Sequence, residues 1–345
     1  MRWYTKAGLI RAAVAFGLTI ALLLGVGGIM ALMPGRSYRG ELPPLTPQQE
    51  QYRDRLQRDI EAIAGLGEHN HVYYENLLQT EAYLEGRFAE AGYAVRRQEY
   101  PIGDRIFTNL DVEIPGTEKP EEIVVVGAHY DSVTGSPGAN DNGSGAAAVL
   151  ALADRFAGTA PKRTLRFVEF VNEEPPFAWT PDMGSWVYAK RSRQENEKIV
   201  AMLSLETMGY YSDAPGSQTY PLGLLNQVYP ITGNFIGFIG NLPSGGLVRR
   251  AVKRFRQSVQ FPSEGAILPN AVPGAGWSDH WSFWQEGYPA IMVTDTAPFR
   301  YPYYHTAEDT PDKVDCDRLS RVVFGLEGVV ADLAGVALEG IGNRE

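Results

Sequence analysis

Five side chains in this sequence offer the nitrogen and oxygen donors that bind divalent metal ions. The set consists of His129, Asp141, Glu174, Glu206 and His305, and four of its members lie next to the ends of predicted strands. Imidazole and carboxylate ligands without a cysteine thiolate are typical of a catalytic zinc site, and manganese, iron and cobalt use similar ligands. Each residue taken alone could be structural, so the prediction of a metal-dependent enzyme depends on the whole set.

The charge of this set favours two ions rather than one. Three carboxylates and two neutral histidines carry a charge of −3. Two divalent ions bring +4, and a bridging hydroxide then makes the cluster neutral. Five ligands are sufficient for two ions if one of the carboxylates bridges them.

Two further carboxylates are predicted to act beside the ligands. Asp131 lies two residues beyond His129, on the same face of an extended segment, where its carboxylate can orient the imidazole. Glu173 stands next to the ligand Glu174 and remains unligated. Metal-assisted hydrolysis requires such a carboxylate, which takes a proton from the attacking water and passes it to the leaving amine.

The stretch Val124–Gly145 (VVVGAHYDSVTGSPGANDNGSG) indicates how the chain positions the first of these residues. An apolar β-branched run ends at His129, a loop rich in glycine, proline and serine follows, and Asp141 opens an alanine-rich segment that is typical of a helix. Ligands collect at the carboxyl ends of parallel strands in α/β sheets. His129 and Asp141 are therefore expected where a site would be built.

The same pattern recurs further along the chain, where predicted strands end at Glu173-Glu174 and at Glu206. The predicted strands cover Tyr93–Tyr100, Ile106–Ile114, Ile123–Ala128, Thr164–Val171, Ile199–Leu205 and Ala290–Val293, the first two as an antiparallel pair. The predicted helices cover Thr46–Leu66, Tyr73–Gly92, Ala146–Phe156, Leu247–Gln257 and Val314–Leu338. This alternation predicts an α/β fold with a mixed, mainly parallel sheet flanked by helices on both faces, in one domain from residue 48 to residue 345.

Five motifs, HYDS, DNGSG, NEE, SLETMGYY and YHTAEDT, resemble in their order those of the zinc-dependent aminopeptidase family, which includes bacterial leucyl aminopeptidase, aminopeptidase Y and glutamate carboxypeptidase II. The similarity extends from Tyr73 to Leu338. It implies a mixed sheet flanked by helices, two zinc ions per chain, and peptide substrates that lose their N-terminal residue. It also implies that Asp141 bridges the two zinc ions and that Glu173 is the base. The ligands that it implies are His129, Asp141, Glu174, Glu206 and His305.

The sequence departs from the family pattern at two places. Many members have aspartate where this chain has Glu206, and we still expect this longer side chain to bind metal. The glycine-rich stretch that usually follows the glutamate pair is here PPFAWTPDMGS, whose Phe177 and Trp179 are expected to reshape the rim of the substrate pocket.

Three other histidines are interpreted as non-ligands. His280, in the segment WSDHW, is expected to be structural or to line the pocket. His69 and His71 lie in a loop without a nearby carboxylate at a strand end.

Two other functions remain open at this stage. A glutaminyl cyclase keeps a similar aspartate, glutamate and histidine set around a single zinc and catalyses an intramolecular aminolysis. His129 and Glu206 together favour the second metal and hence the peptidase. A receptor-like or scaffolding ectodomain on a degraded peptidase fold is a non-enzymatic alternative, although degradation normally removes ligands and here the set is intact.

Composition excludes one class of partner. The formal net charge is −10 and the pI is about 5.1, whereas nucleic-acid binding requires a basic face. The single cysteine, Cys316, excludes an intrachain disulfide and does not identify a compartment. The sequence does not indicate an oligomeric state.

The N-terminal residues predict a membrane anchor. Arg2, Lys6 and Arg11 precede Ala12–Met33, a run without charged residues that is long enough for a helix to cross a hydrocarbon core of about 30 Å. We assign residues 1–35 to a signal anchor and residues 36–47 to a linker. The basic flank places the short N-terminus in the cytoplasm and the catalytic domain on the other side of the membrane. A cleaved signal peptide, which would release a secreted protein, and a buried core helix are the alternatives.

Overall fold

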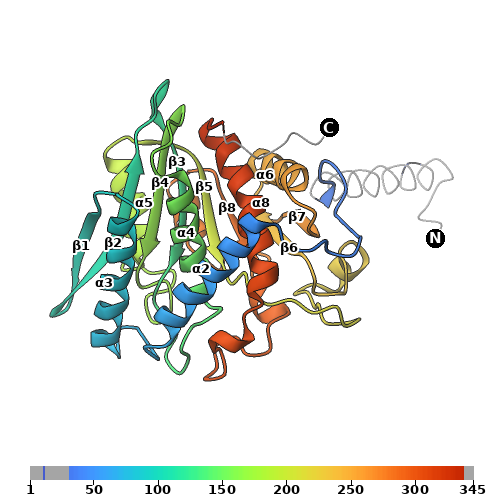
Figure 1. Ribbon diagram of the computed structural model, residues 1–345, viewed down its shortest axis with the longest axis horizontal. Helices are drawn as coiled ribbons and strands as arrows, with labels where there is room; N and C mark the ends of the chain where they lie inside the picture. The colour runs from blue at the N-terminus through green and yellow to red at the C-terminus, as the bar shows by residue number, and fades with distance from the viewer. Residues whose placement is uncertain (1–10, 12–30, 338–345) are drawn as a thin grey trace, which may run out of the picture.

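A twisted eight-stranded sheet forms the centre of the computed structural model, which describes residue 11 and residues 31–337 (Figure 1). The strands lie in the order β1-β2-β4-β3-β5-β8-β6-β7. Their bounds are β1 Arg96–Ile102, β2 Arg105–Ile114, β3 Lys119–His129, β4 Arg163–Phe170, β5 Lys198–Glu206, β6 Ile236–Gly240, β7 Ser263–Ile267 and β8 Ala290–Thr294. Strands β4, β3, β5 and β8 are parallel, as are β6 and β7, whereas β1–β2, β2–β4 and β8–β6 are antiparallel pairs. The predicted mixed, mainly parallel sheet is therefore confirmed.

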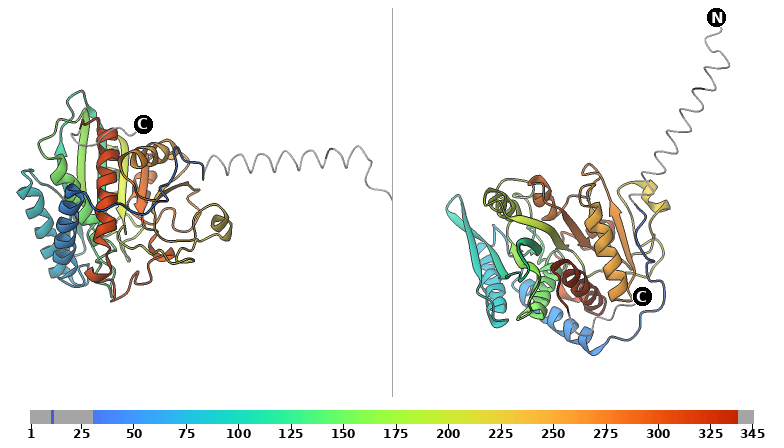
Figure 2. Two further views of the ribbon diagram at one scale, coloured as in Figure 1. Left: turned by 45° about the vertical axis from the view of Figure 1, so that its right-hand side comes forward. Right: turned by 90° about the horizontal axis from the view of Figure 1, so that it is seen from above.

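Helices cover both faces of this sheet, as predicted (Figures 1 and 2). One face carries α2 Pro47–Ala64, α3 Tyr74–Glu90, α4 Gly143–Phe156, α6 Gly245–Ser258 and α8 Cys316–Ala334. The other face carries α5 Gly184–Gln194 and the short α7 His280–Gln285. Among the described residues the sheet is thus the middle layer of three.

The alternation of side chains along β3 shows why the sheet is covered on both sides. Val124, Val126 and Ala128 pack into the core with α4 and α8, whereas Ile123 and Val125 belong to the core on the side of α5 and α7. Because successive side chains of a strand point to opposite faces, a continuous apolar run requires burial on both. The strand-end His129 is thereby carried on the buried C-terminal half of β3.

Helix α4 begins directly beside the end of β5, and a glycine allows this approach. A Cβ atom on Gly145 would collide with the carbonyl oxygen of Leu205. Asn142 caps the helix, since its side-chain oxygen accepts a hydrogen bond from the backbone N–H of Gly145. The loop that carries Asp141 is therefore held next to the strand that carries Glu206.

Two strands and two α-helices in the described part of the chain were not predicted from the sequence, and neither were three short 3₁₀-helices. Strands β6 and β7 have five residues each, and helices α5 and α7 have few turns. The predicted anchor Ala12–Met33 lies outside the described residues except for residues 31–33. None of the helices in the described part of the chain combines the length and the apolar character that crossing a membrane requires.

Candidate metal centre

The residues predicted to bind metal come together at the carboxyl edge of the parallel strands. His129 is the last residue of β3, and Glu206 is the last residue of β5. Glu174 follows β4, Asp141 precedes α4, and His305 lies in the loop between β8 and α8. Five separate segments therefore converge on one edge of the sheet, where α/β folds collect ligands.

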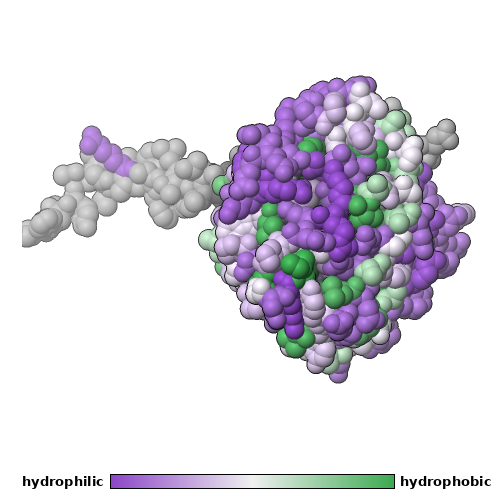
Figure 3. All heavy atoms as spheres, turned by 90° about the vertical axis from the view of Figure 1, so that its left-hand side faces the viewer, coloured by the Kyte–Doolittle hydropathy of each residue, from purple (hydrophilic) through white to green (hydrophobic). Residues whose placement is uncertain are grey.

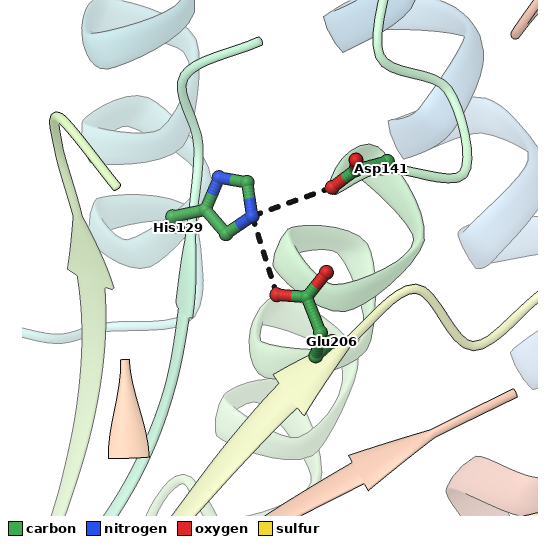
Figure 4. Close-up of side chains that lie close together, drawn as sticks. All are labelled: His129, Asp141 and Glu206. Atoms are coloured by element: carbon green, nitrogen blue, oxygen red, sulfur yellow. Dashed lines mark ion pairs between the residues drawn. The ribbon is translucent and has the colours of Figure 1, made fainter. Parts of the chain in front are cut away.

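The first group of donors consists of His129, Asp141 and Glu206 (Figure 4). The Nε2 atom of His129 lies 3.5 Å from an oxygen of Asp141 and 3.3 Å from an oxygen of Glu206. The three side chains point toward one another from β3, β5 and the loop before α4. Their ligand atoms all lie within 4.8 Å of one another, and all three residues are buried.

The second group consists of Asp141, Glu174 and His305. The Nε2 atom of His305 lies 3.0 Å from Asp141 Oδ2 and 3.3 Å from Glu174 Oε1. The first group uses the other oxygen, Asp141 Oδ1. Asp141 is therefore the one residue that both groups share, with one carboxylate oxygen facing each.

These spacings fit a tetrahedral metal ion. Ligand atoms about 2.0–2.1 Å from a tetrahedral zinc lie roughly 3.3–3.4 Å from one another. Among the described residues, His129 Nε2, Asp141 Oδ2, Glu174 Oε1 and His305 Nε2 are buried without a hydrogen-bond partner. Buried polar atoms are normally paired, so four orphaned donor atoms facing one another indicate groups that a cation satisfies.

The electrostatics of the centre also favour a cation. Burial alone would lower the pKa of His129, but the charges of Glu206, Asp131 and Asp141 outweigh it and raise that pKa well above its ordinary value. Burial would likewise lower the pKa of His305, whereas Asp141 and Glu174 raise it to about 10. Burial and the neighbouring charge of Asp141 raise the pKa of Glu174 to about 7. The centre thus holds an excess of negative charge that positive ions would compensate.

Asp131 contacts both His129 and the glutamate pair. The Nδ1–H group of His129 donates a hydrogen bond to the backbone carbonyl oxygen of Asp131 at 3.0 Å, and Nε2 is directed at the centre. The carboxylate of Asp131, predicted to orient this ring, lies 3.6 Å from Nδ1. Its two oxygens instead accept hydrogen bonds from the backbone N–H groups of Glu173 and Glu174, at 3.0 and 3.2 Å. Asp131 therefore links the loop after β3 to the loop after β4.

Glu173 lies beside the first group without being part of it. Its nearest carboxylate oxygen is 3.9 Å from His129 Nε2. Burial raises the pKa of Glu173 well above its usual range, and the charges of Glu174 and Glu206 add to this effect against the opposing influence of His129. A carboxylate with a raised pKa accepts a proton more readily, which suits a general base.

Two supporting residues were not singled out from the sequence. The Ser278 hydroxyl donates to Glu206 at 2.7 Å. The carboxylate of Asp309 accepts hydrogen bonds from the backbone N–H groups of Asn140 and Asp141, at 2.8 and 3.1 Å. The sequence offered one signal for the role of Asp309, which lies four residues after His305 inside the motif YHTAEDT.

Two of the other histidines, His280 and His69, have structural partners. The Nε2 atom of His280 lies 2.8 Å from the carbonyl oxygen of Ala275, and its ring packs edge-on against Trp284. His69 Nδ1 lies 2.8 Å from the carbonyl oxygen of Gly67. Neither belongs to the two donor groups found among the described residues, which agrees with their interpretation as non-ligands.

An apolar pocket adjoins the centre. Glu206 and Tyr304 line the end next to the metal-binding groups, and the other walls are mainly apolar and aromatic side chains such as Leu225, Tyr229, Phe235, Ile239, Trp277, Met292 and Phe299. Trp179 packs against Trp277 with ring centroids 6.5 Å apart. The unusual segment after the glutamate pair thus reaches the wall of this pocket.

Comparison with known proteins agrees with this geometry. The model of peptidase family M28 matches residues 109–329, which include every residue of the two donor groups. The chain belongs to peptidase family M28. In a metallopeptidase of this family, the buried histidine, aspartate and glutamate groups indicate zinc as the metal.

Two relatives show how far the similarity extends. The uncharacterized protein YfbL of Escherichia coli K12 is 34% identical over 260 residues, which cover 73% of this chain and 79% of YfbL. Leucine aminopeptidase 1 of Arthroderma otae is 27% identical over 306 residues, which cover 82% of this chain and 74% of that protein.

Solved structures share the fold of this M28 member. The LapA aminopeptidase of Legionella pneumophila superposes with a TM-score of 0.63 at 16% identity, covering 86% of this chain and 77% of LapA. The glutaminyl cyclase of Fimbriiglobus ruber superposes with a TM-score of 0.60 at 19% identity, covering 87% of this chain and 99% of the cyclase. At such identities the match concerns the fold alone, so the residues of the centre must distinguish the two activities.

Proposed function

We propose that this M28 member is a di-zinc aminopeptidase that removes N-terminal residues from peptides. The observation that carries this proposal is the position of Asp141, whose two carboxylate oxygens face two separate groups of buried donors. His129 and Glu206 would complete the site of one zinc ion, and Glu174 and His305 that of the other. Bound zinc would supply Lewis-acid polarisation of the scissile carbonyl and a lowered pKa of the attacking water.

The protein groups beside the donors carry the proton in this proposal. Glu173 accepts a proton from the attacking water through a carboxylate oxygen, because burial and neighbouring charges keep its proton affinity high. The protonated Glu173 then donates this proton to the nitrogen of the leaving amine as the peptide bond breaks. The carboxylate of Asp131 holds Glu173 in place, because it accepts a hydrogen bond from the backbone N–H of Glu173.

The pocket next to the centre suggests which substrates are preferred. Its walls are apolar and aromatic, and Glu206 at one end belongs to the proposed zinc site. The side chain of the N-terminal residue would enter this pocket while the peptide bond lies at the zinc ions. We therefore expect large apolar residues to be removed faster than small or charged ones, because their transfer from water is favourable.

A glutaminyl cyclase is the second candidate, because cyclase structures share the fold. A single zinc would occupy the group formed by Asp141, Glu174 and His305. The intact pair of His129 and Glu206, 3.3 Å apart, provides a second group and favours the peptidase.

Metal analysis together with a substrate panel tests the proposal. We expect about two zinc ions per chain, release of leucine from leucyl peptides and no cyclisation of peptides that begin with glutamine. About one ion per chain together with cyclisation would favour the cyclase. Metal-replete protein without activity on either substrate class would contradict both functions.

A further inference from the structure

The loop of residues 221–231 exposes large apolar side chains. Leu222, Leu224, Val228 and Ile231 are between 46% and 70% exposed, and η1 (Gly223–Gln227) carries part of this group. Residues 214–248 include no aspartate, glutamate, lysine or arginine. Clustered apolar exposure of this kind marks a contact surface on soluble domains.

The inner side of the same loop already has a role. Leu225 and Tyr229 line the apolar pocket beside the metal centre. The Tyr220 and Tyr229 rings pack together with centroids 5.9 Å apart, and the Tyr220 hydroxyl donates to the carbonyl oxygen of Pro230 at 2.6 Å. The loop is therefore fixed from inside, while its outer leucine and valine side chains remain in contact with solvent.

The loop lies next to the segment that follows the predicted anchor. The Tyr229 hydroxyl donates to the carbonyl oxygen of Gly265 in the edge strand β7, at 3.0 Å. Met33 packs against the same glycine, where a Cβ atom would come within 2.8 Å of its side chain. The loop and residue 33 thus meet at one residue of β7, the strand at one end of the sheet (Figure 1).

The segment after Met33 is fixed to the domain. The Arg256 guanidinium donates to the carbonyl oxygens of Pro34 and Gly35, at 3.0 and 3.2 Å. The backbone N–H of Ser263 in β7 donates to the Ser37 hydroxyl at 2.9 Å. The point at which the apolar run Ala12–Met33 joins the domain is therefore held beside the loop.

We propose that residues 221–231 contact the surface of the lipid bilayer in which the predicted anchor is embedded. Leu222, Leu224 and Val228 would enter the boundary between headgroups and acyl chains, as the apolar faces of interfacial segments do. Arg36 and Arg39, which are exposed in the adjoining segment, would face the lipid phosphates. This inference depends on the predicted anchor and is independent of the peptidase activity.

Depth-dependent quenching on the full-length chain tests this contact. A fluorophore is attached to Leu224→Cys in a Cys316→Ala background, and the protein is reconstituted into vesicles of phosphatidylcholine and phosphatidylglycerol in equal amounts. Ile106→Cys is the matched control, because Ile106 is 46% exposed on β2 at the opposite end of the sheet, where the surface is mainly hydrophilic (Figure 3). We expect lipids that carry a nitroxide near the headgroup to quench the label at position 224 several-fold more than the label at position 106.

Two further variants strengthen this measurement. Val228→Cys gives a second labelling site if the first variant folds poorly, and Leu222→Asp should reduce quenching at position 224 several-fold. Equal quenching at positions 224 and 106 would overturn the proposal. A label shielded from water but not quenched by the lipid nitroxide would also overturn it, because a second copy or another part of the chain would then cover the loop. Failure of the full-length chain to insert into vesicles would also overturn the proposal, because the predicted anchor would then be absent.

Discussion

Asp141 divides the candidate centre into two halves that can be tested separately. Each of its oxygens faces a different histidine, His129 at 3.5 Å and His305 at 3.0 Å. Loss of a residue that belongs to one group alone should therefore affect one ion and leave the other. Glu206 is the residue of choice, because it belongs to the first group alone.

For Glu206→Ala we expect the metal content to fall from about two to about one per chain. The ion held by Asp141, Glu174 and His305 should remain, since none of these residues depends on Glu206. Glu206→Asp should be milder, because a shorter carboxylate remains at the end of β5. Metal analysis of the purified variants decides the question. Two full equivalents of metal in Glu206→Ala would assign Glu206 a structural role. In that case the substitution should change only the free energy of unfolding, by about 0.5–3 kcal/mol.

Glu173→Gln separates proton transfer from metal binding. The amide preserves the size of the side chain but cannot accept the proton, so turnover should fall by at least about 10²-fold while both ions remain. The measurements are kcat on a leucyl peptide and the metal content of the same preparation. Near-normal turnover in a metal-replete variant would place the base elsewhere.

At the scale of the elements, the centre depends on loops that are fixed by long-range hydrogen bonds. Asp309 holds the loop before α4 through the N–H groups of Asn140 and Asp141, and it also accepts a hydrogen bond from the Tyr301 hydroxyl at 2.6 Å. The carboxylate that both donor groups share is therefore positioned by a residue more than one hundred and sixty positions away in the sequence.

Asp309→Asn should weaken the binding of both metal ions, whereas Glu206→Ala should affect only one of them. The asparagine offers one acceptor oxygen in place of two and turns an N–H group toward the backbone donors. We expect metal affinity to fall about 10–100-fold, the usual effect of removing a group that orients a ligand. Competition with a chelator measures this affinity. Tyr301→Phe is the control, because it keeps both backbone hydrogen bonds and should lower affinity much less.

The sequence could predict the centre because its residues mark strand ends. His129 and Glu206 end their strands and Glu174 follows one, and parallel strands bring their ends to the same edge of the sheet. The roles of Asp309 and Ser278 could not be predicted in this way, since they depend on where distant loops return. Strands β6 and β7 were not predicted, because five residues are too few to establish an alternation of apolar and polar side chains.

The whole molecule combines the peptidase fold with an N-terminal run whose role is still a prediction. The predicted linker, residues 36–47, is held to the domain at two points: the Ser263 N–H donates to the Ser37 hydroxyl at 2.9 Å, and Arg321 donates to the carbonyl oxygen of Pro43 at 2.6 Å. A chain anchored through such a segment would have a restricted orientation relative to the bilayer. The predicted placement of the catalytic domain outside the cytoplasm follows from the same anchor.

Carbonate extraction of membranes from cells that express the full-length chain tests this anchor. If Ala12–Met33 spans the bilayer, the protein should stay in the membrane pellet and need detergent for release. The variant Leu22→Arg/Leu23→Arg should move to the soluble fraction, because each arginine near the centre of a membrane helix costs about 2.5–3.5 kcal/mol on insertion scales. Both substitutions lie outside the peptidase domain, so the expressed variant should keep its activity on leucyl peptides. Soluble wild-type protein whose N-terminus lies near Arg36 would instead show that the apolar run is a cleaved signal peptide.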